Sequence, residues 1–135
     1  MNSSASKQTL AQFFSAFGSG DVEGVVALFH PEAAITAVRS GTPAPGQLHG
    51  AYVGHSGVRA FLAKLANTFD TKAFSVDHVV GDGAVAFASG QFVHELRSTR
   101  KTFESAWALV CEIEDGRIRT YRFFEDSAAF QTACG

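Results

Sequence analysis

Residues 101–126 constrain the fold of this chain most, because two alternating runs are joined there by a tight-turn signal. The signal is Asp115-Gly116, a pair that readily adopts the positive backbone angles of a two-residue hairpin. Successive side chains of a strand point to opposite faces, so Phe103 and Trp107 share one bulky, mostly apolar face. The stretch therefore predicts a β-hairpin with an apolar face that other elements must cover.

Length and charge limit what the chain can be. Its 135 residues are enough to bury a core, so we expect a single domain over residues 1–135. The formal net charge is -2 and no basic run is present, which argues against a nucleic-acid partner. No apolar stretch approaches the roughly 20 residues that span a bilayer, and the polar start is not typical of a signal peptide. We therefore expect a cytoplasmic protein without a membrane partner.

Helical periodicity dominates the first half of the chain. Apolar residues recur at helical spacing over residues 7–17 and 56–68. Asp21 has the position of an N-cap for a short helix between them, and His30-Pro31 is expected to end that helix. A short strand is expected over residues 33–38.

A long loop rich in Gly and Pro follows over residues 40–54. Loops longer than roughly 12 residues in compact domains often form lids or binding loops. The loop residues His49 and Tyr52 are therefore of interest.

The second half of the chain alternates with the period of strands. Residues 74–80 and 85–93 form two predicted strands before the hairpin, and a brief helix follows it. Helices segregated from consecutive antiparallel strands indicate an α+β fold with the helices on one face of one sheet.

Small residues form the other face of this predicted sheet. Ala86 and Ala88 alternate with bulkier residues in one strand, and Ala106 and Ala108 do so in the next. A flat patch of small residues on a sheet suits association with a second copy. We therefore expect a homodimer through this face.

Three segments carry a resemblance to a known family. They are FFSAFGSGDVEGVVALFHPEAAI (13–35), HGAYVGHSGVRAFLAKL (49–65) and EIEDGRIRTYRFFEDSAAF (112–130). Together they resemble the SnoaL-like, ketosteroid-isomerase-like branch of the nuclear transport factor 2 superfamily. The resemblance implies an NTF2-like cone-shaped barrel, in which a curved antiparallel sheet wraps around three N-terminal helices and encloses an apolar cavity.

The ketosteroid isomerase residues are missing from the matching positions. The resemblance places its oxyanion-binding tyrosine at Phe13, its base at Ala37, and its second aspartate at Leu109 or Ala108. None of these side chains exchanges a proton or hydrogen-bonds an oxyanion, so steroid isomerisation by that mechanism is not expected.

The polyketide cyclase of the SnoaL branch offers a different catalytic residue. Its C-terminal aspartate, an acid and base, matches Asp126. Beside Trp107, Phe87 and Phe123, this carboxylate would be partly desolvated, which raises the pKa toward values useful for proton abstraction. The alternative is that Asp126 caps the short helix beginning near Ser127, and the two roles are compatible.

A ligand in the cavity is expected to meet residues from the helices, the long loop and the bulky sheet face. The last strand is ambiguous because both of its faces contain aromatic residues, and a β-bulge would reconcile them. The predicted ligand-binding residues are Phe13, Phe17, Tyr52, Phe87, Ser89, Gln91, Ser105, Trp107, Leu109, Tyr121 and Phe123.

No cofactor or metal is expected. The five histidines lack the spacing of a helix-borne pair or a Cys/His ribbon, and no phosphate-binding glycine loop or nucleophile elbow is present. We expect binding of a hydrophobic, cyclic or polyketide-like molecule, with cofactor-free isomerisation, cyclisation or dehydration if the protein is an enzyme. The alternative is a non-catalytic ligand-binding or interaction module.

Overall fold

The computed structural model describes residues 3–44 and 47–135, so positions 45 and 46 of the predicted loop lie outside the described residues. Among the described helices, none is both long and apolar enough to cross a membrane. The elements, in chain order, are α1 (Ser3–Gly18), α2 (Val22–Ala27), β1 (Phe29–Ala37), β2 (Gly50–Val53), α3 (Gly54–Thr68), β3 (Phe69–Asp82), β4 (Val85–Leu96), β5 (Thr102–Glu114), β6 (Arg117–Glu125) and α4 (Ser127–Cys134).

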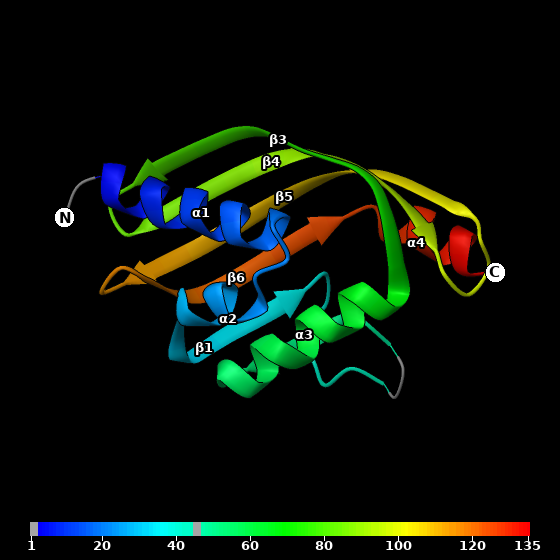
Figure 1. The fold of residues 1–135 in the computed structure, drawn as a ribbon, viewed down its shortest axis with the longest axis horizontal. Coiled ribbons are helices and arrows are strands. Elements are labelled where there is room, and N and C mark those ends of the chain that lie inside the picture. Colours follow the sequence, from blue (N-terminus) through cyan, green and yellow to red (C-terminus); the bar gives the residue numbers. More distant parts are fainter. Residues whose placement is uncertain (1–2, 45–46) are drawn as a thin grey trace.

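One curved sheet of six strands, in the order β2-β1-β6-β5-β4-β3, organises the molecule. Neighbouring strands are antiparallel except for β1 and β6, which run parallel. Helices α1, α2 and α3 lie against the concave side of the sheet, and α4 lies beyond the far end of β6 (Figure 1). The predicted α+β architecture is confirmed, with the parallel β1–β6 pair as an addition.

Local sequence signals account for several element ends. The Asp21 carboxylate accepts a hydrogen bond of 3.0 Å from the amide of Gly24, which confirms the predicted N-cap of α2. At the β5–β6 turn, Asp115 and Gly116 have φ angles of 53° and 75°, as the predicted hairpin requires.

Other predicted boundaries are wrong. Helix α2 ends at Ala27, and β1 already begins at Phe29, so His30-Pro31 lies in a strand. Strand β2 lies within the predicted loop, where it pairs with β1. Helix α3 begins at Gly54, two residues before the predicted start, and its N-cap Val53 makes no side-chain hydrogen bond.

Strand β4 turns the opposite face inward from the one predicted. Its register pairs Ala88 with Leu109 and Gly90 with Trp107, and paired residues share a face. Ala88 is 5% exposed, whereas Phe87 is 42% exposed on the outer face. The pairing with β5 decides the phase, because the inward residues of β5 include the largest apolar side chains of the hairpin.

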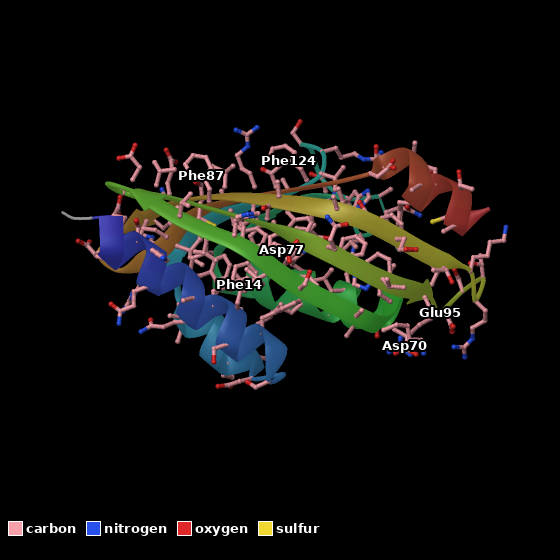
Figure 2. All side chains as sticks on the ribbon, turned by 90° about the horizontal axis from the view of Figure 1, so that it is seen from above. Phe14, Asp70, Asp77, Phe87, Glu95 and Phe124 are labelled. Carbon is pink, nitrogen blue, oxygen red and sulfur yellow. The ribbon has the colours of Figure 1, made fainter. Side chains whose placement is uncertain are left out.

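The four alanines predicted to share one sheet face therefore lie on two different faces. Ala106 and Ala108 lie on the outer face, but Ala86 and Ala88 are buried on the inner face. Phe87 and Phe124 instead project from the outer face, on the opposite side of the sheet from Phe14 of α1 (Figure 2).

The predicted bulge in the last strand is present. The register between β5 and β6 shifts between Glu112, which pairs with Thr120, and Ile113, which pairs with Ile118. Ile118 and Tyr121 are both buried as a result. From the bulge onward, Tyr121, Phe123 and Glu125 share the inner face.

Candidate functional site

A cavity of about 650 Å³ lies between the inner face of the sheet and helices α1, α2 and α3. Most of its lining is aromatic or aliphatic, including Phe13 and Phe17 of α1, which stack with ring centroids 5.7 Å apart. Its volume lies in the usual range of ligand pockets, roughly 300–1,000 Å³. A cyclic small molecule therefore fits inside.

Four parallel rings, which we call the aromatic row, form one side of the cavity. Trp107 lies between Phe74 and Phe123, with centroid distances of 5.2 and 5.7 Å and interplanar angles of 16° and 17°. Tyr121 extends the row, 6.4 Å from Phe123 at 10°. Offset parallel pairs of this kind each contribute about 0.5–1.5 kcal/mol beyond their burial. The aromatic row therefore gives the cavity a rigid wall.

Gly90 permits this arrangement. It lies in β4 between Ser75 of β3 and Trp107 of β5, and a Cβ at this position would overlap the carbonyl oxygen of Ser75. Because that space is free of side chain, the indole N–H of Trp107 reaches across β4 and donates to the Ser75 carbonyl oxygen at 3.2 Å. The indole of Trp107 in β5 is therefore hydrogen-bonded to β3 across β4, because residue 90 has no side chain in the way.

A buried His–Glu pair lines the cavity near α4. Nε2 of His49 lies 2.9 Å from Oε2 of Glu125, and the two side chains are only 3% and 6% exposed. The imidazole packs against Phe130 of α4, with centroids 4.5 Å apart. Nδ1 of His49 is buried without a hydrogen-bond partner in the described part of the chain. Such a buried pair in an apolar pocket is a candidate acid–base site.

Besides Asp21 and Thr71, two other polar side chains, Tyr121 and His94, line the cavity. Burial raises the pKa of Tyr121 well above its usual value, and the charges of Cys111 and Glu125 add to the effect. Its phenol therefore stays protonated, and no described group hydrogen-bonds its hydroxyl. His94 is 8% exposed, and burial lowers its pKa to about 4, so its imidazole is neutral at pH 7.

Part of the predicted site is where the sequence analysis placed it. Phe13, Phe17, Tyr121 and Phe123 line the cavity. Trp107 is buried behind it in the aromatic row.

Other predicted ligand contacts lie elsewhere. Leu109 and Tyr52 are buried in the core outside the cavity lining, and the Tyr52 hydroxyl donates to the Leu48 carbonyl oxygen. Phe87, Ser89 and Gln91 lie on the outer face, because β4 has the opposite phase from the one predicted.

Asp126 does not lie at the mouth of the cavity. It is exposed, and its carboxylate accepts a hydrogen bond of 3.0 Å from the amide of Ala129, so the alternative reading as the cap of α4 is confirmed. Ser105 accepts a hydrogen bond from the amide of Asp126 at 3.0 Å, and both line a shallow outer depression. The prediction of Asp126 as a cavity group is wrong, because β6 ends with Glu125 facing inward and Asp126 already turning into α4. Ser105 shares a face with its partner Phe92, but it lies outside the cavity lining, where its hydroxyl meets the amide of Asp126.

Tyr121 was predicted as a cavity residue and His49 was noted in the loop, but Glu125 and His94 were not predicted. Glu125 shares the inward phase of Tyr121 and Phe123, and His49 lies in the loop expected to line a binding site. The pairing of Glu125 with His49 joins positions 76 residues apart, which no local pattern reveals. Among the described residues, no group of three or more His, Cys, Asp or Glu side chains could hold a metal ion.

A match to a family model shows the family to which this chain belongs. The model of the SnoaL-like domain matches residues 10–121, which is most of the chain. The chain belongs to the SnoaL-like family. This confirms the resemblance seen in the sequence. No curated protein sequence matches the chain.

Solved structures share the fold over nearly the whole chain. An NTF2-like protein from Burkholderia xenovorans LB400 has a TM-score of 0.84 at 23% identity, covering 100% of this chain and 99% of that one. TerC co-crystallized with polyporic acid has a TM-score of 0.80 at 17% identity, with coverage of 96% and 97%. An LEH-like epoxide hydrolase from M. tuberculosis has 0.73 at 15%, with coverage of 97% and 90%. At these identities the likeness shows the fold alone.

Proposed function

We propose that this SnoaL-like protein binds an apolar cyclic molecule in its cavity and transfers a proton on it without a cofactor. The observation that carries the proposal is the Glu125–His49 pair, buried in a mostly apolar lining. Similar solved structures include one crystallised with polyporic acid and one named as an epoxide hydrolase, which supports small-molecule chemistry in this fold.

Glu125 is the proposed general base. With its proton on Nε2, His49 donates to Oε2 of Glu125 and holds the carboxylate in place. Oε1 has no partner in the described part of the chain and is free to accept a proton from a ligand carbon next to a carbonyl group. The electron pair of that C–H bond then moves onto the carbonyl oxygen, and an enolate forms.

Tyr121 is the proposed donor to the developing oxyanion. Its phenol lines the same cavity, and its raised pKa keeps the proton in place. A preorganised donor in a water-poor site stabilises developing negative charge far more than in water. If the proton on Glu125 is replaced by one from solvent before it returns to the same carbon, the result is hydrogen exchange at that carbon. Return of a proton to a conjugated carbon gives isomerisation.

Proton exchange tests this proposal without knowledge of the natural substrate. The bicyclic ketone 2-tetralone is incubated with the protein in D2O, and loss of the proton signals next to its carbonyl is followed by NMR. We expect Glu125→Gln to slow the protein-catalysed exchange by about 100-fold or more, since a general base contributes about 10²–10⁴-fold. Glutamine keeps an oxygen that can accept from His49, so the fold is preserved.

The adjacent carboxylate provides the matched control. Asp126→Asn makes the same carboxylate-to-amide change outside the cavity, and exchange is expected to stay at the wild-type rate. Equal exchange rates for Glu125→Gln and wild type would refute the assignment of the base. Binding of 2-tetralone without accelerated exchange by the wild type would favour the alternative, a non-catalytic ligand-binding module.

We also propose that the protein is a cytoplasmic homodimer, in which two copies associate through their outer sheet faces. Val80, Phe87 and Phe124 are 55%, 42% and 40% exposed there, beside the small residues Ala106 and Ala108. Exposed apolar side chains gathered on one sheet face are typical of a protein–protein interface.

A further inference from the structure

The charged groups that line the cavity are all carboxylates. Asp21 lies in the turn between α1 and α2, and Glu125 pairs with His49 deeper inside. No lysine or arginine is among the described lining residues. A buried anion without a cationic partner is strongly disfavoured. The lining therefore favours an uncharged ligand over a carboxylate or phosphate.

His94 is a second polar group on the lining, independent of the proposed base. Its ring lies between Phe69 and Phe92, with centroid distances of 4.3 and 4.1 Å and interplanar angles of 13° and 24°. Both faces of the imidazole are therefore covered, and only its edge is available. Nδ1 on that edge lies 3.0 Å from the hydroxyl oxygen of Thr71.

The other edge nitrogen, Nε2 of His94, has no protein partner in the described part of the chain. Because the imidazole is neutral, one ring nitrogen donates and the other accepts, and the Thr71 hydroxyl can pair with Nδ1 in either tautomer. His94 lines the cavity, so this unpartnered nitrogen is available for a directed hydrogen bond to a ligand there.

A chain of aromatic contacts joins the two polar groups along one side of the cavity. The ring of His49 contacts Phe130, the ring of Phe130 lies 6.0 Å from that of Phe69, and Phe69 stacks on His94. The lining residues of helices α1, α2 and α3 are all apolar. A complementary ligand thus carries its polar atoms on one side and an apolar body on the other.

We propose that the cavity selects uncharged cyclic molecules with two oxygen functions on one side, one received by the Glu125–His49 pair and the other by Nε2 of His94. This inference rests on the proposed function, because it defines the ligand of the same cavity. His94 acts here as a specificity residue and takes no part in the proton transfer.

Three naphthalene-based probes test the inference by titration calorimetry: naphthalene, 2,3-dihydroxynaphthalene and 2-naphthoate. We expect wild type to bind the diol at least tenfold more tightly than 2-naphthoate. His94→Phe is expected to weaken diol binding about tenfold, the effect of one buried hydrogen bond. The same variant should leave naphthalene binding within about twofold, since phenylalanine keeps a flat ring between Phe69 and Phe92.

Two further variants make the result specific. His78→Phe makes the same change at an exposed position on the outer face of β3, and both affinities should match wild type. Thr71→Val leaves the imidazole in place but removes the group that orients it, and a smaller loss of diol affinity is expected. Since Thr71 is exposed, this variant also serves if His94→Phe does not fold.

The outcomes separate this inference from the proposed function. Binding of 2-naphthoate as tight as that of the diol, or diol binding unaffected by His94→Phe and Thr71→Val, would overturn the inference alone, provided that naphthalene still binds. Failure of all three probes to bind would overturn the proposed function as well.

Discussion

Replacing Gly90 with alanine tests the link between the sheet and the aromatic row. A Cβ at this position would overlap the carbonyl oxygen of Ser75 and approach Cζ2 of Trp107 to 2.8 Å. The backbone oxygen cannot rotate away, so β3 must move away from β4, and the indole must shift as well. These movements break the 3.2 Å hydrogen bond between Trp107 and Ser75.

The expected loss of stability follows from two contributions. Losing a hydrogen bond of this type costs about 1 kcal/mol, and forcing extra volume into a packed region costs about 1–3 kcal/mol. We therefore expect Gly90→Ala to lower the free energy of unfolding by about 3 kcal/mol, a large part of the roughly 5–15 kcal/mol typical of a domain. With an unfolding entropy of about 2.1 cal/mol/K per residue, Tm should fall by about 10 °C.

Thermal unfolding followed by circular dichroism measures this loss, and the fluorescence of Trp107, the one tryptophan of the chain, reports on its surroundings. Gly18→Ala is the control, because no atom outside its chain neighbours lies within 4 Å of a Cβ there, and its Tm should be unchanged or slightly raised. A Gly90→Ala protein with wild-type Tm and wild-type tryptophan emission would show that the close approach around Gly90 does not hold the row.

Three further predictions concern the cap of α4, the buried histidine and the outer face. Asp126→Asn should lower the free energy of unfolding by less than about 1 kcal/mol, since asparagine also caps helices, whereas Asp126→Ala should cost about 1 kcal/mol; urea unfolding distinguishes them. Because burial lowers the pKa of His94 from 6.5 to about 4, the stability tied to its neutral form is complete above pH 6.5 and is lost as the pH falls toward 4. His94→Phe should therefore lose less Tm than wild type between pH 7 and pH 4, and equal losses would contradict this. Phe87→Lys should convert a dimer into a monomer in analytical ultracentrifugation at unchanged Tm of the monomer fold, and an unchanged sedimentation coefficient would exclude this face as the interface.

Several elements could be predicted because their signals are local. Asp115 and Gly116 occupy adjacent positions of one turn, and Asp21 caps a helix that begins at the next residue. The bulge in β6 was also predictable, since two aromatic phases within one strand cannot both face inward without an extra residue. The resemblance to the SnoaL-like family predicted how these elements are arranged, with a curved sheet around the N-terminal helices.

The predicted location of Asp126 at the cavity is wrong for a physical reason. Asp126 and Glu125 are adjacent carboxylates at the end of a strand, and only the inward phase separates a cavity group from a helix cap. That phase depends on how β6 pairs with β5 beyond the bulge. The sequence shows which side chains of β6 alternate, but the register of β6 against β5 is set only when the sheet assembles.

The sequence by itself determined which residues alternate, where the turns and caps lie, and that the chain has one sheet with covering helices. Only the tertiary structure decided which face of β4 is covered, because Gly90 and Ala88 are small enough to lie beneath the helices and beside Trp107. It also brought His49 to Glu125 across 76 residues. Periodicity specifies which side chains share a face of a strand. Long-range strand pairing and packing specify whether that face contacts the helices or solvent.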